Sequence, residues 1–560
     1  MKRPDESIPL APSMTPIYPK NGRYSRPSGV DRRIFFLSLQ AVVNAIVIGL
    51  IAKGLVFLID FITNLAFYGK FSLAPSGPAG NQLGVAVIAI PVIGSILVGL
   101  IARFGSKAIR GHGIPEAMEK IILDESRIPP LITLLKPLSA AISIGTGGPF
   151  GAEGPIIATG GAFGSFTGQV MHISASERKI MLSAGACAGM AAIFGTPLAA
   201  VLLAIELLLF EFSARSIIPV AIACVTGAGM HLWLFGSEPV FAMGVIPVPS
   251  GTDLVIYMCI GLIIGVLASL ISKSVYAVED LFEKLPVHWM WWPAIGAIAV
   301  GVVGYFAPFT MGVGYDNIQH LLGGSLPLLI LFSLCVLKYI SWVIALGSGT
   351  SGGTLAPLFT IGGALGSLLG MCLLYFFPSL GITLSTAALV GMAAMFAGAS
   401  RALLTSIVFA LETTGQPNGL LPLVGACVAA YFVSFFLMEG SIMTEKIRRR
   451  GISTPDSYQP DLLTHARVKS LTKPKPDAET YPIINENETL DICVQVMGKL
   501  NVSALSVTSA NDDTLIKGKV TAMDIIKYYT DRKDAEQKFS APARTKRWMV
   551  YSRQVVRKRK

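Results

Sequence analysis

The sequence predicts an all-α polytopic membrane protein with a small α/β domain near its C-terminal end. Of the 560 residues, 52% are hydrophobic and 14% are charged, and apolar runs follow one another between residues 35 and 443. Soluble proteins usually carry about 25% charged residues. Since a span needs about 20 apolar residues, the stretch has room for more than about ten spans. A soluble enzyme with one hydrophobic anchor is therefore excluded.

Glycine and proline interrupt the apolar runs. The chain has 57 glycines and 34 prolines, many of them inside these runs. Both residues disfavour long regular helices, so we expect broken, tilted helices around a polar cavity, which favours a transporter or a channel. The seven cysteines are scattered without ligand spacing, so neither a metal site nor a disulfide is expected.

The order of apolar and polar segments predicts four parts. We expect an N-terminal tail over residues 1–33, a transmembrane domain over 34–450, an α/β domain over 451–537 and a basic tail over 538–560. Long apolar runs begin near Phe35 and again near Val255, so the transmembrane domain divides into repeats over 34–235 and 252–450. Lysine and arginine concentrate at both ends of the chain, which indicates cytoplasmic termini in a cell membrane. Nucleic-acid binding by these tails is the weaker alternative.

An internal repeat supports this division. The segment from Gly151 to Gly164 matches the segment from Gly353 to Gly366 at six positions, all at one offset of 202 residues. A second match at an offset of 206 pairs Glu206 with Glu412, and we interpret both carboxylates as structural. The match itself leaves parallel and inverted repeats open, although transporters often use inverted ones.

Three segments combine a glycine-rich turn with a proline in the first turn of an apolar helix. They are Gly111-His-Gly-Ile-Pro115, Gly151-Ala-Glu-Gly-Pro155 and Gly353-Thr-Leu-Ala-Pro357. Proline suits a first helical turn, and glycine lets the backbone approach a ligand. Helix starts that converge in a membrane offer free N–H groups to an anion without a full positive charge. The alternative is that these are ordinary helix starts.

Glu153 is the strongest single candidate for a functional residue. It lies between apolar segments, and carboxylates inside a membrane are costly and usually functional. Ionised, such a carboxylate would occupy the place of an anion and block the path; protonated, it would leave. A helix-capping role is the alternative.

The three motifs in this order, with the repeat, resemble the CLC family of chloride channels and chloride/proton antiporters over residues 35–450. The resemblance implies a homodimer with one pore in each subunit, two inverted structural repeats and a gating role for Glu153. It implies that the anion-binding residues are His112, Gly113, Ile114, Gly151, Ala152, Gly154, Thr354, Leu355, Ala356 and Met443.

Four positions depart from the family pattern. His112 stands where a serine is usual, Leu355 where a phenylalanine is usual, and Met443 where a tyrosine is common. Leu207 occupies the place of the inner glutamate of proton-coupled members, next to Glu206 and about 100° of α-helix away. Without that glutamate, strict exchange with protons is in doubt. His112 would then donate a hydrogen bond to the anion, titrate near neutral pH, or simply satisfy nearby backbone.

Residues beyond 460 read as a soluble β-α-β-β-α unit. A helix over 489–500, strands over 503–508 and 515–520 and a helix from Thr521 are predicted, with a turn at Asn511. The corner Gly518-Lys-Val-Thr-Ala-Met-Asp524 resembles a single CBS module. Because CBS modules work in pairs, the resemblance implies pairing with a second subunit or loss of nucleotide binding; otherwise no cofactor is expected.

The predicted function is transport of a small inorganic anion, chloride first, gated by Glu153 and passive or loosely coupled to protons. Fluoride/proton or chloride/proton exchange is the alternative, because fluoride-exporting members of the family depart at the serine and tyrosine positions. A membrane sensor or scaffold with vestigial transport is the second alternative. A cation transporter is disfavoured because the membrane part has few carboxylates. The expected partners are the anion, protons and membrane lipid. Enzymatic activity is not expected, since no ATP-binding or hydrolase motif is present.

Overall fold

The computed structural model describes residues 28–451, 463, 466–473, 481–509 and 512–540, which fall into two compact units. The unit over Ser28–Ser457 is helical, and the second unit contains the small sheet. Residues 1–27 of the predicted N-terminal tail and residues 541–560 of the predicted basic tail lie outside the described residues.

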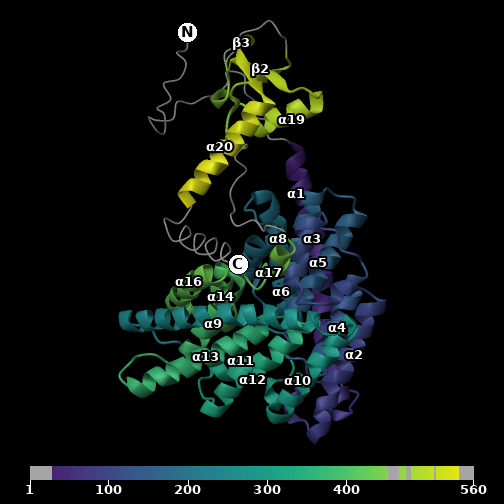
Figure 1. Cartoon of the computed structure of the whole chain (residues 1–560), viewed down its shortest axis with the longest axis vertical. Helices are drawn as coiled ribbons and strands as arrows, with labels where there is room; N and C mark the ends of the chain where they lie inside the picture. Colours follow the sequence, from purple (N-terminus) through teal and green to yellow (C-terminus); the bar gives the residue numbers. More distant parts are fainter. Residues whose placement is uncertain (1–27, 452–462, 464–465, 474–480, 510–511, 541–560) are drawn as a thin grey trace, which may run out of the picture. The chain divides into compact units, whose positions relative to one another are not determined.

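The helical unit consists of two halves in which α1–α8 and α9–α16 follow in the same order, and α17 comes after the second half (Figure 1). The first half holds α1 (Ser28–Tyr68), η1 (Pro78–Gly80), η2 (Gly84–Ile88), α2 (Ala89–Phe104), η3 (Lys107–Ile109), α3 (Ile114–Leu123), α4 (Ile132–Gly145), α5 (Glu153–Val170), α6 (Ala175–Phe194), α7 (Pro197–Leu203), the π-helical η4 (Ala204–Leu209) and α8 (Ala214–Leu234). The second half holds α9 (Gly251–Glu283), η5 (Trp289–Trp291), α10 (Trp292–Phe306), η6 (Pro308–Thr310), α11 (Tyr315–Leu322), α12 (Leu328–Gly347), α13 (Leu355–Phe376), α14 (Leu384–Ser400), α15 (Leu403–Thr414), η7 (Pro417–Gly419), α16 (Leu420–Leu437) and α17 (Glu445–Arg449).

Helix lengths confirm the polytopic membrane fold. Among the described residues, eight helices are long and apolar enough to cross a membrane. Helices α3, α4, α7, α11 and α15 are shorter, as the glycines and prolines in the apolar runs predict. Helix α1 begins at Ser28, several residues before the apolar run. The apolar run indicates which part of a helix lies in lipid, but a helix can extend beyond the lipid, so hydropathy does not locate its first residue.

Reciprocal contacts relate the two halves by a two-fold axis. Gly151 pairs antiparallel with Gly353, its own equivalent at the offset of 202. The Glu206 carboxylate accepts hydrogen bonds from the Leu404 and Thr405 N–H groups, both at 2.9 Å. In return, the Glu412 carboxylate accepts from the N–H groups at the equivalent positions 198 and 199 (3.1 and 2.8 Å). Each glutamate therefore caps a helix start in the other half, as its structural interpretation predicts.

Small residues let the paired helices approach closely. A Cβ added at Gly160 of α5 would lie 2.2 Å from the Gly185 carbonyl oxygen of α6. The equivalent pair in the second half, Gly362 of α13 and Gly391 of α14, is nearly as tight, at 2.5 Å. Without a hydrophobic driving force between helices in lipid, such close packing supplies the attraction.

The second unit has the predicted order of elements. It contains η8 (Val468–Ser470), β1 (Ile483–Asn485), α19 (Leu490–Leu500), β2 (Ala504–Ser509), β3 (Asp512–Thr521) and α20 (Ala522–Ser540). Strand β2 pairs parallel with β1 and antiparallel with β3. Val468, Leu490, Leu505 and Val520 are fully buried in its core. The sheet with its helices fits a CBS-like domain.

Candidate functional site

The three glycine-rich turns converge at one place in the helical unit. A Cβ at Gly154 would lie 2.3 Å from the His112 carbonyl oxygen and 2.8 Å from Gly353 Cα, so all three turns meet there. A Cβ at Gly113 would lie 2.3 Å from the Gly154 carbonyl oxygen, and its φ of +96° also favours glycine. Gly111 bridges to Ser351 in parallel. Glycine is therefore needed at this junction because backbone approaches backbone.

A helix starts at each of the three turns, as the proline pattern predicts. Helix α3 begins at Ile114, α5 begins at Glu153 and α13 begins at Leu355, with Thr354 as its N-cap. Ile114, Ala152, Thr354, Leu355 and Ala356 are all buried. The first N–H groups of a helix have no partner within that helix, so the convergence concentrates donors and positive dipole ends.

The Glu153 carboxylate occupies this junction. It is 1% exposed, and one of its oxygens accepts a hydrogen bond from the Ala356 N–H at the start of α13. The other oxygen accepts from the Tyr315 hydroxyl of α11 at 3.2 Å. A negative group thus sits where free backbone donors gather, which is the position an anion would take.

His112 is buried in the turn before α3, with 7% of its surface exposed. Its Nδ1 has no hydrogen-bond partner among the described residues. A buried imidazole nitrogen without a partner has hydrogen-bonding capacity to offer a ligand. This disfavours the interpretation that His112 only satisfies nearby backbone.

Two predicted positions lie outside the three turns, in elements that pack against α3 or come just before one that does. Met443 is fully buried in the segment before α17, where its backbone N–H donates to the Ser441 hydroxyl at 3.2 Å. Leu207 is 4% exposed and lies in η4, which packs against α3. Because η4 is π-helical, the assumption of α-helical spacing between Leu207 and Glu206 was wrong. A π-helix has more residues per turn than an α-helix, so the angle between neighbouring side chains is smaller.

Buried charges that the sequence analysis did not single out surround the junction. Lys136 of α4 and Lys338 of α12 are 1% and 0% exposed. Glu116 accepts a hydrogen bond from the Gly113 N–H at 2.6 Å and pairs with Lys446 of α17 at 3.0 Å. The two lysines could have been identified from the sequence, because each lies within an apolar run and they are separated by the repeat offset of 202 residues.

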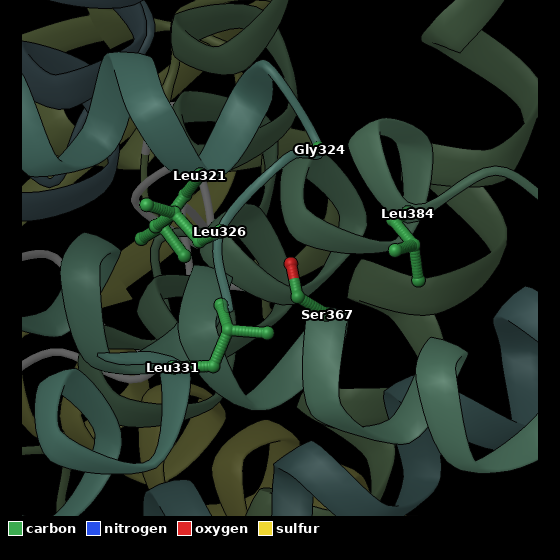
Figure 2. Close-up of a pocket in the computed structure, with 6 residues that line it drawn as sticks. All are labelled: Leu321, Gly324, Leu326, Leu331, Ser367 and Leu384. Carbon is green, nitrogen blue, oxygen red and sulfur yellow. The ribbon is translucent and has the colours of Figure 1, made fainter. Parts of the chain in front are cut away.

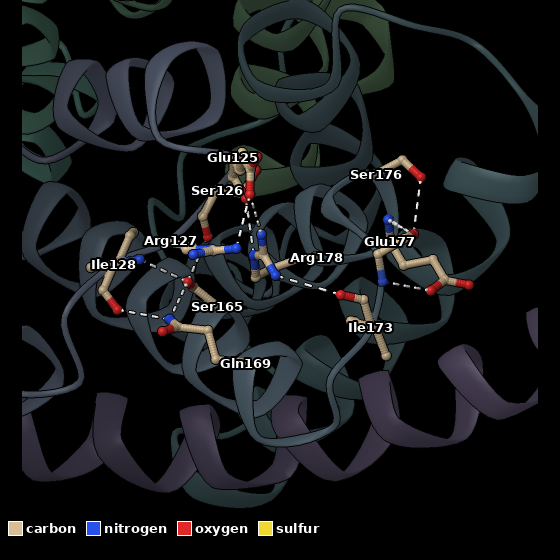
Figure 3. Close-up of polar contacts among 11 residues, drawn as sticks. Glu125, Ser126, Arg127, Ile128, Ser165, Gln169, Ile173, Ser176, Glu177 and Arg178 are labelled. Carbon is tan, nitrogen blue, oxygen red and sulfur yellow. Dashed lines mark hydrogen bonds and ion pairs between the residues drawn. The ribbon is translucent and has the colours of Figure 1, made fainter. Parts of the chain in front are cut away.

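A polar network ties α3 and α5 together at their other ends (Figure 3). In the loop after α3, Glu125 and Ser126 adopt positive φ values of 48° and 62°. The Glu125 carbonyl accepts from Arg178 Nε at 2.9 Å, and the Ser126 carbonyl accepts from the Ser165 hydroxyl of α5 at 2.6 Å. Helices α3 and α5 are thus linked at both ends.

A hollow elsewhere in the unit does not resemble an ion site. Figure 2 shows that it is lined by Leu321, Gly324, Leu326, Leu331, Ser367 and Leu384. Leucine side chains dominate the lining, with the Ser367 hydroxyl as its polar group. Such a surface offers an anion few donors.

The fold and this junction define the class of protein, and comparison with known proteins identifies its family. Residues 93–435 match the family model described as "Voltage gated chloride channel". The chain therefore belongs to the CLC family.

Curated relatives span most of the chain. An H(+)/Cl(-) exchange transporter ClcA of Yersinia pseudotuberculosis is 28% identical over 419 residues, which cover 73% of this chain and 86% of the relative. The protein of the same description from Yersinia pestis is 30% identical over 349 residues, covering 60% and 72%.

Solved structures share the fold. A slow cyanobacterial Cl-/H+ antiporter is 23% identical and covers 74% of this chain and 97% of its own, with a TM-score of 0.67. A CLC-type fluoride/proton antiporter, also 23% identical, covers 73% and 97% with a TM-score of 0.59. A eukaryotic CLC transporter is 19% identical and covers 89% and 98% with a TM-score of 0.60.

Proposed function

We propose that this protein carries a small inorganic anion, chloride, across the membrane in exchange for protons, with Glu153 as the gate. The observation that carries the proposal is the hydrogen bond from the Ala356 N–H to the buried Glu153 carboxylate. A carboxylate and an anion compete for the same donors at a helix start. Protonation removes the charge of the carboxylate, frees the position and admits the anion.

The relatives favour exchange over passive conduction. They are named H(+)/Cl(-) exchange transporters, whereas the sequence alone favoured passive or loosely coupled transport because of Leu207. We therefore propose exchange in which Glu153 handles the proton on one side and another route replaces the inner carboxylate. His112, with its unpartnered Nδ1, is the candidate residue for that route.

Fluoride is the second candidate anion. The buried Nδ1 of His112 supports it, because a small, strongly hydrated anion needs good hydrogen-bond donors in place of its water. The likeness to a fluoride/proton antiporter is one of fold. A titration with both anions separates the candidates.

We also propose a homodimer with both termini in the cytoplasm of a cell-membrane protein. Large apolar side chains of α16 are exposed, among them Leu421, Phe432 and Phe436 at 61%, 59% and 68%. Such a face is covered by lipid or by a second subunit. A dimer would also bring together two CBS-like domains and allow nucleotide binding between them. Cross-linking in liposomes tests the dimer.

Anion efflux from liposomes tests the proposed function. Purified protein is reconstituted, and chloride and fluoride efflux are compared with and without a protonophore. We expect chloride efflux that drives proton uptake, and Glu153→Gln should abolish proton movement while anion flux continues. Glu238→Gln, an exposed carboxylate, is the matched control and should behave as the wild type.

Three results would contradict the proposal. Passive flux without proton movement in the wild-type protein would indicate a channel. Proton movement that Glu153→Gln leaves unchanged would contradict the gating role of Glu153, and no anion flux in the wild-type protein would favour the sensor or scaffold alternative.

A further inference from the structure

Two buried lysines occupy equivalent positions in the two halves. Lys136 of α4 and Lys338 of α12 are separated by the repeat offset of 202 residues. Lys136 Nζ donates to the Ile109 and Gly111 carbonyls, both at 2.8 Å, in the turn before α3. Lys338 Nζ donates to the Thr310 carbonyl at 3.1 Å, in the segment before α11. Both lysines therefore donate to backbone carbonyls in the segment before a short helix.

Their charges are balanced differently. The charge of Lys136 acts on Glu116, a carboxylate that is fixed by its hydrogen bond to the Gly113 N–H at 2.6 Å. Glu116 also pairs with Lys446. The counter-charge of Lys136 is therefore a permanent part of the structure.

The nearby carboxylate is a different one for Lys338. Among the described residues, its Nζ makes the one hydrogen bond to Thr310, and neither Lys338 nor Lys136 forms an ion pair within 4.0 Å. The carboxylate whose charge acts on it is Glu153, the proposed gate. A charge on a fully buried lysine inside a membrane is costly unless a negative charge lies near it.

The local structure places Lys338 beside the gate. A Cβ at Gly314 would lie 2.8 Å from Lys338 Nζ, and the next residue, Tyr315, donates its hydroxyl to the Glu153 carboxylate at 3.2 Å. Two consecutive residues therefore lie against the ammonium group and the gate, Gly314 against Lys338 and Tyr315 against Glu153.

We propose that Lys338 is the counter-charge of the gate position and neutralises whichever negative group is there, the Glu153 carboxylate or the transported anion. This inference rests on the proposed function. When the carboxylate leaves or gains a proton, Lys338 is left without a counter-charge and attracts an anion into the position. Coulomb attraction acts over a longer range than a hydrogen bond, so the occupant need not touch Nζ. Departure of the gate and entry of the anion are thereby coupled through one fixed charge.

The proposal predicts a non-additive pattern of anion affinities. In the wild-type protein the anion replaces a carboxylate, so Lys338 has a negative neighbour before and after binding. Neutralising Lys338 should then change the chloride Kd little. In Glu153→Gln the position starts neutral, and the anion gains the full attraction. Neutralising Lys338 in that background should raise the Kd about tenfold or more.

Calorimetric titration of the purified full-length protein with chloride tests this pattern. Lys338→Gln is the main variant, since glutamine keeps a donor for the Thr310 carbonyl but carries no charge. Lys338→Arg, which keeps the charge, should retain the affinity of the Glu153→Gln background. Lys284→Met, at an exposed lysine in the same background, controls for a general loss of positive charge. Size-exclusion chromatography checks folding, and Lys338→Met replaces Lys338→Gln if the latter does not fold.

Each result has one meaning. A large loss of affinity in the Glu153→Gln background alone supports the proposal. An equal loss in both backgrounds would make Lys338 a simple structural residue or anion ligand, and no loss in either would remove its role; both overturn the proposal while leaving the proposed function intact. Absence of chloride binding in every variant, Glu153→Gln included, would overturn the proposed function itself.

Discussion

Removing the Tyr315 hydroxyl should weaken the hold of the gate on the anion position. The hydroxyl donates to the Glu153 carboxylate at 3.2 Å, while the ring packs edge-on against Phe194 and Phe241 with both centroids at 5.7 Å. Tyr315→Phe keeps these ring contacts and deletes the hydrogen bond alone. A hydrogen bond to a charged group contributes about 1.5–3 kcal/mol, and a bond of this length belongs at the lower end.

The lost hydrogen bond destabilises only the state in which the Glu153 carboxylate occupies the anion position. The anion therefore displaces the carboxylate more easily. About 1.5 kcal/mol corresponds to about a tenfold lower chloride Kd, measured by calorimetric titration. In a Glu153→Ala background no carboxylate accepts the bond, and Tyr315→Phe should leave the Kd unchanged. The reasoning is refuted if the Kd of the otherwise wild-type protein does not fall, or if it falls by the same factor in both backgrounds.

Two further predictions concern stability, measured as the thermal unfolding midpoint in detergent. Gly154→Ala should destabilise the protein by about 1–3 kcal/mol or more, because its Cβ would lie 2.3 Å from the His112 carbonyl oxygen. Gly161→Ala in the same helix, where the nearest atom is 3.5 Å away, is the control; an equal loss there would contradict the prediction. Glu206→Ala, which also loses a 2.6 Å bond from a threonine hydroxyl, should cost about 1 kcal/mol more than Glu412→Ala. Equal or reversed midpoints would show that the two caps do not contribute in proportion to their hydrogen bonds.

Much of the site could be predicted because its residues are constrained locally. Gly154 and Gly353 are glycines because backbone approaches them, and the prolines that follow mark helix starts. Glu206 and Glu412 stood out as a pair through the repeat, and their reciprocal caps agree with the structural interpretation. The order of strands and helices in the soluble unit followed from short-range periodicity.

Other features depend on contacts between distant segments. Tyr315 reaches Glu153 across 162 residues, and nothing in its own surroundings in the sequence indicates this. The partners of Lys136 and Lys338 are likewise set by turns that precede other helices. The π-helical form of η4 around Leu207 was missed because apolar periodicity over six residues does not distinguish π from α.

The sequence by itself determined the class of the fold, the two related halves and the three helix starts, because hydropathy, glycine and proline act on the chain locally. Only the tertiary structure decided that the three turns meet, that the Glu153 carboxylate accepts a hydrogen bond from the start of α13, and that two equivalent buried lysines bind carbonyls in the segments before α3 and α11. Electrostatic balance depends on distances between atoms far apart in the chain, and those distances exist only once the two halves have packed together.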